Sequence, residues 1–164
     1  MIETELRERK SPRLKGYDYS FPGAYFVTIC TKDRKCILGE IVGEGLCPLP
    51  KNTLTPIGKE TEASIQFINK NCKGVSIPKY VIMPNHIHLI VVLEDSGGDG
   101  TPPLQDVIRI LKSYTTNKYD DVLWQRSFHD HIIRDDEDYL KIWNYIDTNP
   151  LKWELDCFYT KKPQ

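Results

Sequence analysis

The sequence predicts an α+β fold: a ferredoxin-like or RRM-like antiparallel sheet with the element order βαββαβ and an added C-terminal helix. Two observations lead to this prediction. Apolar, β-branched runs alternate with segments that have the apolar spacing of a helix, and one more helical segment follows the last run. No internal repeat or change of composition divides the chain, so residues 1–164 are expected to form a single domain.

The first 20 residues are expected to form a basic arm. Residues 7–15 (RERKSPRLK) hold five basic side chains against one acid, although the whole chain has a net charge of −1. Two interpretations stay open. Exposed termini of this composition are commonly frayed and solvated, or the arm contacts nucleic-acid phosphates through Arg9, Lys10, Arg13 and Lys15.

The first half of the chain predicts four strands and a helix. Residues 24–31 (AYFVTICT) are typical of a strand, whereas 37–54 are rich in Gly and Pro and predict loops with one short strand at 40–42. Thr55 followed by Pro56 predicts the start of a helix that runs to about Asn69. Residues 79–94 (KYVIMPNHIHLIVVLE) then predict two strands, divided by a turn at Pro84–Asn85.

The second half predicts two helices around one strand. Residues 94–103 (EDSGGDGTPP) are expected to be a flexible loop. A helix over 104–119, a strand over 123–134 and a helix over 136–149 follow, and Pro150 is expected to end the last helix. Asn149, directly before that proline, is expected to be biased away from helical geometry.

A pair of histidines is the main candidate for chemistry. His86 and His88 stand two residues apart in an apolar strand, so their side chains share one face, roughly 6–7 Å apart at the backbone. Two imidazoles in this position can bind one metal ion. The alternative is a pair of partly buried histidines that bond to the backbone.

The last predicted helix supplies a candidate nucleophile. Tyr145 and Asn149 are four residues apart and share a helix face, so an Asn149 amide oxygen near the metal would bring the Tyr145 hydroxyl close to it. Tyr114 is the competing tyrosine, but it falls on the apolar stripe of its own helix. His129 and His131 form a second pair, which is either a polar strand face, a group that supports the first site, or a rival metal site.

Three blocks of the sequence resemble a known family. MPNHIHLIV, LWQRSFHDHIIRDDEDY and YIDTNP occur in the order found in the HUH single-tyrosine transposases, and the chain is most similar to the REP-associated tyrosine transposases. The resemblance covers residues 25–153. It implies single-stranded DNA substrates with hairpins, a Mg²⁺ or Mn²⁺ ion and a 5′-phosphotyrosine intermediate. By motif, His86 and His88 would be metal ligands, Tyr145 the nucleophile and Asn149 the third ligand.

Further expectations concern the surroundings of this site. His131 is a candidate for a supporting position near the active centre, and Arg126 is a candidate for contacts with DNA phosphates or bases. On ligand preference alone, two imidazoles suit Mn²⁺ or Zn²⁺ better than Mg²⁺, and the identity of the ion stays open. Both a homodimer and a monomer are compatible with the sequence.

Two other functions remain open. One is a catalytically silent RRM-like module that binds nucleic acid, which would call for exposed aromatic residues on the central strands. The other is a metal-dependent hydrolase, which would need an acidic ligand; Asp130 and Asp147 can be nominated only by position. The chain has no apolar run long enough to cross a bilayer and no N-terminal signal, so it is expected to be cytoplasmic and associated with the nucleoid. Its five cysteines are scattered, and neither a disulfide framework nor a zinc knuckle is expected.

Overall fold

The computed structural model describes residues 16–42, 51–95, 100–119 and 121–159. Arg9, Lys10, Arg13 and Lys15, with most of the expected basic arm, lie outside the described residues, as does the centre of the 94–103 loop. The structure therefore tests the predicted sheet, helices and candidate site, but not the arm.

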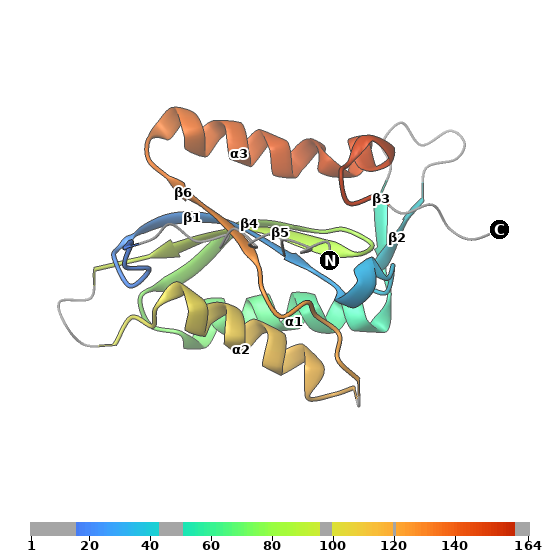
Figure 1. The fold of residues 1–164 in the computed structure, drawn as a ribbon, viewed down its shortest axis with the longest axis horizontal. Coiled ribbons are helices and arrows are strands. Elements are labelled where there is room, and N and C mark those ends of the chain that lie inside the picture. The colour runs from blue at the N-terminus through green and yellow to red at the C-terminus, as the bar shows by residue number, and fades with distance from the viewer. Residues whose placement is uncertain (1–15, 43–50, 96–99, 120, 160–164) are drawn as a thin grey trace, which may run out of the picture.

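Four antiparallel strands form the main sheet (Figure 1). Their spatial order is β4-β5-β1-β6, with β1 (Gly23–Cys30) and β5 (His86–Leu93) in the centre and β4 (Val75–Ile82) and β6 (His129–Ile133) at the edges. A helix connects β1 to β4 and another connects β5 to β6, which is the split βαβ arrangement of a ferredoxin-like fold. The predicted fold class is confirmed.

The helices cover both faces of the sheet. α1 (Pro56–Asn71) and α2 (Leu104–Thr116) lie on one face, and the added helix α3 (Asp136–Thr148) lies on the other (Figure 1). Side chains alternate along β5: Ile87 and Leu89 enter the main core beneath α1 and α2, whereas Ile90 packs against α3. Both faces of β5 are buried, which explains why its sequence is a nearly continuous apolar run.

Helix ends follow the capping residues. The Thr55 side chain accepts a hydrogen bond from the Gly58 N–H at 3.1 Å, so α1 begins where the sequence predicts. Asp135 caps α3 in the same way through the Asp138 N–H, at 2.8 Å. None of the helices in the described ranges is long and apolar enough to span a bilayer.

Residues 37–54 differ in part from the prediction. The short strand expected at 40–42 is present as β2 (Gly39–Val42), but residues expected to be loop form a second strand, β3 (Lys51–Leu54), and the two pair as a separate hairpin. A short 3₁₀ turn, η1 (Lys32–Arg34), precedes this hairpin.

The strand predicted over 123–134 is shorter in the structure. Within residues 123–134, the part that pairs with β1 over several residues is β6, while Trp124 forms a single bridge to Thr31. Leu123, Trp124 and Phe128 are buried in the main core. The apolar character of this segment therefore reflects core packing rather than strand pairing.

The chain does not leave helical geometry at Asn149, contrary to the expectation from Pro150. Asn149 has φ −58° and ψ −45° and caps α3, and a 3₁₀ helix, η2 (Asn149–Leu155), continues from it. Pro150 stands in the first turn of η2, where its missing N–H leaves no hydrogen bond unmade. This continuation places Trp153 and Phe158 against His86 of the sheet.

Candidate metal centre and nucleophile

The two histidines of β5 lie side by side on the face covered by α3. Their Nε2 atoms are 3.1 Å apart, and both rings are buried, with 0% and 1% of His86 and His88 exposed. Aromatic rings from the C-terminal segment cover His86: Phe158 at 4.7 Å and Trp153 at 5.9 Å between ring centroids. The pair is therefore part of a closed site rather than of an open strand surface.

Asn85 determines which nitrogen of His86 carries a proton. The Asn85 Nδ2 donates to the carbonyl oxygens of Arg34 (3.2 Å) and Phe158 (2.8 Å), which fixes the orientation of the amide. Its Oδ1 then faces the Nδ1 of His86 at 2.9 Å. An amide oxygen only accepts, so Nδ1 must donate, and in the neutral ring Nε2 keeps a free lone pair. This lone pair points to the Nε2 of His88.

His88 has a partner that can adapt to either tautomer. Its Nδ1 lies 2.8 Å from the Thr28 hydroxyl, which can donate or accept. Burial lowers the pKa of His88 to about 3, helped by the neighbouring His86, while Asp156 acts in the opposite direction. Burial, with the charge of Arg34, also lowers the pKa of His86 to about 3. Both rings are therefore neutral at physiological pH, as metal ligands must be.

Tyr145 extends from α3 to this pair. Its hydroxyl oxygen is 3.4 Å from the Nε2 of His88, and 41% of the residue is exposed. Phe26 supports both rings, at 5.3 Å from His88 and edge-on at 5.9 Å from Tyr145. Burial and the negative charge of Asp156 raise the pKa of the Tyr145 phenol, and Asn149 lowers it. The competing Tyr114 lies on α2, beneath the opposite face, against Phe67.

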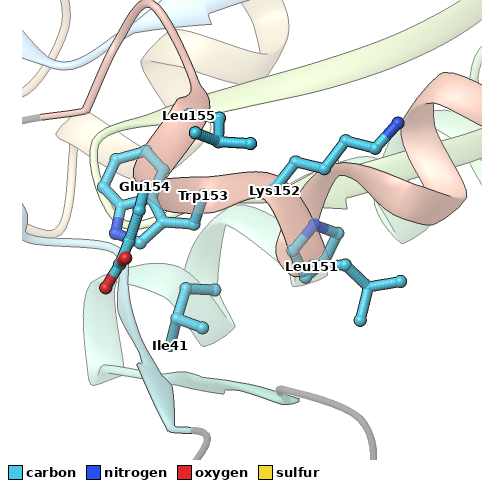
Figure 2. Close-up of a pocket in the computed structure, with 7 residues that line it drawn as sticks. Ile41, Leu151, Lys152, Trp153, Glu154 and Leu155 are labelled. Carbon is cyan, nitrogen blue, oxygen red and sulfur yellow. The ribbon is translucent and has the colours of Figure 1, made fainter.

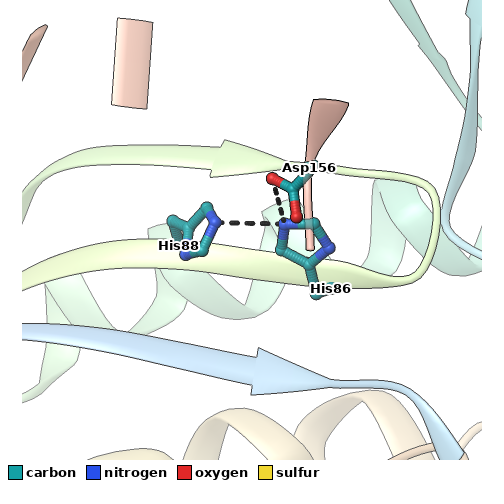
Figure 3. Close-up of side chains that lie close together, drawn as sticks. All are labelled: His86, His88 and Asp156. Atoms are coloured by element: carbon teal, nitrogen blue, oxygen red, sulfur yellow. Dashed lines mark hydrogen bonds and ion pairs between the residues drawn. The ribbon is translucent and has the colours of Figure 1, made fainter. Parts of the chain in front are cut away.

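Asn149 reaches the site, and so does Asp156, which the sequence analysis missed. Asn149 is 2% exposed; its Nδ2 donates to the Asp156 Oδ2 at 3.1 Å, while its buried Oδ1 has no hydrogen-bond partner. Asp156 Oδ2 lies 3.9 Å from the His86 Nε2 (Figure 3). Because His86 is neutral, this contact is not an ion pair at physiological pH.

These donors fit a metal ion. In the described part of the chain, His86, His88 and Asp156 are the one group of three His, Cys, Asp or Glu side chains whose ligand atoms all lie within 4.8 Å of one another. Ring nitrogens of His86 and His88 gather with a carboxylate oxygen of Asp156. Asn149, which bonds to this carboxylate, adds a buried amide oxygen without a hydrogen-bond partner. This is a donor set for a divalent transition metal.

The surface around the site has two hollows formed by the C-terminal segment. One is lined by Tyr145, Asn149, Lys152, Leu155, Asp156 and Cys157, so the phenol opens onto it. The other lies between η2 and Ile41 of β2, and Glu154 and Trp153 line it (Figure 2). The first hollow gives a route for a ligand to approach the Tyr145 hydroxyl.

Two predicted residues lie elsewhere. His131 is on the same sheet face, but its Nε2 bonds to Asp138 Oδ2 at 2.7 Å in the first turn of α3, and its neighbour across the ladder is Phe26. Phe26 thus lies between His131 and His88. Arg126 is exposed and lines a hollow beside α2 with Arg109 and Lys112, on the other side of the sheet from the histidine pair.

Comparison with known proteins gives two relatives in sequence. No family model matches the chain. It is 33% identical to an uncharacterised protein of Haemophilus influenzae, over 94% of each chain. It is 29% identical, over 82% of its length and 74% of the relative, to another H. influenzae protein provisionally named a REP-associated tyrosine transposase.

A solved structure shows the same fold. It is a REP-associated tyrosine transposase bound to a REP hairpin, with a TM-score of 0.63 and 22% identity, covering 85% of this chain and 73% of that chain. This chain has a histidine pair on its ferredoxin-like sheet, facing a tyrosine on the added helix. In sequence and in fold, the chain is similar to the REP-associated tyrosine transposases.

Proposed function

We propose that this protein cleaves and rejoins single-stranded DNA through a covalent bond between Tyr145 and a 5′-phosphate, with a divalent cation bound by His86 and His88. The observation that carries the proposal is the position of the Tyr145 hydroxyl, 3.4 Å from the Nε2 of a neutral, buried His88 in the same chain. A nucleophile next to a metal-binding pair is what phosphoryl transfer to tyrosine requires.

The reaction is a direct exchange of oxygen atoms at phosphorus. The Tyr145 oxygen attacks the scissile phosphate, loses its proton, and forms a phosphotyrosine while the bond to the 3′-oxygen breaks and a 3′-hydroxyl is released. A divalent cation at the site would polarise a phosphoryl oxygen and offset the negative charge of the transition state. Because phenol is a better leaving group than an alkyl alcohol, a DNA 3′-hydroxyl can reverse the step without ATP.

The surrounding residues prepare the histidines and the tyrosine for this role. Asn85 and Thr28 hold the two Nδ1 atoms, which directs the Nε2 lone pairs towards a shared ligand. Asn149, through its unpartnered Oδ1, is the proposed amide ligand. Two imidazoles favour Mn²⁺ over Mg²⁺ as the ion bound.

Hairpin DNA is the proposed substrate. The relative with the same fold is bound to a REP hairpin. On this chain, Arg126 and Arg109 line a hollow beside α2 and would contact DNA phosphates. Arg9, Lys10, Arg13 and Lys15 of the N-terminal arm are proposed to add further phosphate contacts.

One observation favours a second candidate, a metal-dependent hydrolase. That function needs an acidic residue beside the histidines, and Asp156 is in this position. Water rather than Tyr145 would then attack the phosphate, and no covalent adduct with the protein would form.

One assay separates the two functions. Purified protein is incubated with Mn²⁺ and end-labelled single-stranded hairpin DNA, and the products are run on a denaturing gel. We expect a DNA-linked protein band that Tyr145→Phe abolishes and Tyr114→Phe, the matched control on α2, retains. Released fragments without an adduct would identify the hydrolase. Loss of the adduct in Tyr114→Phe alone would refute the assignment of the nucleophile.

A further inference from the structure

We infer that Asp156, which follows η2, is a charged ligand of the cation site at His86 and His88. The inference rests on the proposed function in one respect, since it takes the histidine pair as the metal site. It adds a third donor from the C-terminal segment, which lies outside the three sequence blocks that carry the family resemblance. The site would then be formed by β5 and by the residues beyond α3.

The carboxylate is held in place by two hydrogen bonds. Asn149 Nδ2 donates to its Oδ2 at 3.1 Å, and the N–H of Phe158 donates to its Oδ1 at 2.7 Å. The carbonyl of Phe158 in turn accepts from Asn85 at 2.8 Å, and Asn85 also orients His86. One small network therefore fixes both a histidine lone pair and the carboxylate that faces it.

Within the described ranges, the Asp156 carboxylate has no Lys or Arg side chain at ion-pair distance. Its side chain is 3% exposed, and the one ion-pair distance that it makes there is 3.9 Å, to the Nε2 of His86. A buried carboxylate without a cation is costly, so such groups are normally paired or bound to metals. A divalent cation beside His86 would supply the missing positive charge.

The three donors suit the same class of metal ion. Two imidazoles and one carboxylate suit Mn²⁺ and related transition metals better than Mg²⁺, which prefers oxygen ligands. Asn149 would act twice, because its Nδ2 positions Asp156 while its Oδ1, buried and unpartnered, remains available as a further ligand. This arrangement explains why a buried amide keeps one polar atom unsatisfied.

The test measures binding of Mn²⁺ to the full chain without DNA, by isothermal titration calorimetry. Asp156→Asn removes the charge but keeps the oxygen that accepts from the Phe158 N–H, so the segment retains its anchor. We expect this variant to bind Mn²⁺ at least about tenfold more weakly than the unmodified chain. Glu154→Gln, two residues away and facing the other hollow, is the control and should change the affinity less than twofold.

A second variant keeps the inference testable if Asp156→Asn folds poorly. Asp156→Cys replaces a hard carboxylate with a soft thiolate, and we expect it to lose Mn²⁺ affinity while it gains Cd²⁺ affinity. A purely structural role for Asp156 would not reverse the metal preference.

The results distinguish this inference from the proposed reaction. Unchanged Mn²⁺ affinity in Asp156→Asn, or an unchanged metal preference in Asp156→Cys, would overturn the inference and leave the reaction of Tyr145 unaffected. An Asp156-dependent Mn²⁺ site without a Tyr145–DNA adduct would overturn the proposed reaction and support the inference.

Discussion

Asn85 connects three parts of the site through a single amide group. Its oxygen orients His86, and its nitrogen bonds to Arg34 of η1 and to Phe158 of the C-terminal segment. Replacing Asn85 with Ala should weaken Mn²⁺ binding by about 10- to 100-fold, because His86 would lose the acceptor that fixes its tautomer and ring angle. Calorimetric titration of Mn²⁺ measures the change.

The control for this prediction is Asn71→Ala. Asn71 is an exposed residue at the end of α1. Its Nδ2 donates to the Phe67 carbonyl of the same helix and, within the described residues, makes no hydrogen bond to either histidine. It should leave the affinity unchanged. If Asn85→Ala binds Mn²⁺ as tightly as Asn71→Ala does, the hydrogen bond to His86 does not prepare the ligand.

The sequence predicts some of the site residues and misses others for a physical reason. The two-residue repeat of a strand places His86 and His88 on one face, and the helical repeat directs Tyr145 and Asn149 to one side of α3. Asp156 follows a 3₁₀ segment, and Asn85 stands in a turn, where neither repeat applies. Only tertiary packing reveals that these two residues belong with the histidines.

Among the elements, the start of α1 approaches the backbone before β2 unusually closely. A Cβ atom on Gly58 would lie 1.9 Å from the Leu38 carbonyl oxygen. Gly58→Ala should therefore destabilise the protein by about 1–3 kcal/mol through overpacking, even though Ala favours a helix over Gly by about 1 kcal/mol. Urea denaturation followed by circular dichroism gives the free energy of unfolding.

Lys59→Ala, at the exposed neighbouring position in the same turn, is the control and should shift stability by less than about 0.5 kcal/mol. A Gly58→Ala variant as stable as this control would mean that α1 can move away from Leu38 at little cost. The β2–β3 hairpin would then be only loosely attached to the helix.

The elements that the sequence predicts well are those with long periodic patterns. β1, β5, α1 and α3 lie within two residues of their predicted bounds at each end. β3 was missed because its four residues show no alternation and follow a Gly- and Pro-rich stretch. Its pairing depends instead on tertiary contacts, such as the bond from the Asn52 side chain to the Ile82 carbonyl of β4.

For the whole molecule, metal binding should be visible as stability. A ligand that binds only the folded state adds RT ln(1 + [L]/Kd), or about 2.7 kcal/mol at a hundredfold excess over Kd. For a domain of this size, Mn²⁺ should therefore raise the Tm by roughly 5–10 °C, as measured by scanning calorimetry. A His86→Ala/His88→Ala double variant should show no such rise. An equal rise in that variant would place the metal elsewhere.

The last prediction concerns whether one chain or two build the active site. Tyr145 and His88 already meet within a single chain, and α3 packs directly on the sheet that carries the histidines. A mixture of Tyr145→Phe and His88→Ala chains, coexpressed so that any dimers can form, should therefore yield no DNA adduct, whereas the unmodified chain does. If helices were exchanged between subunits, mixed dimers would each contain one intact site and restore the adduct. Its appearance in the labelled-hairpin assay would show that the tyrosine acts on the histidines of a partner.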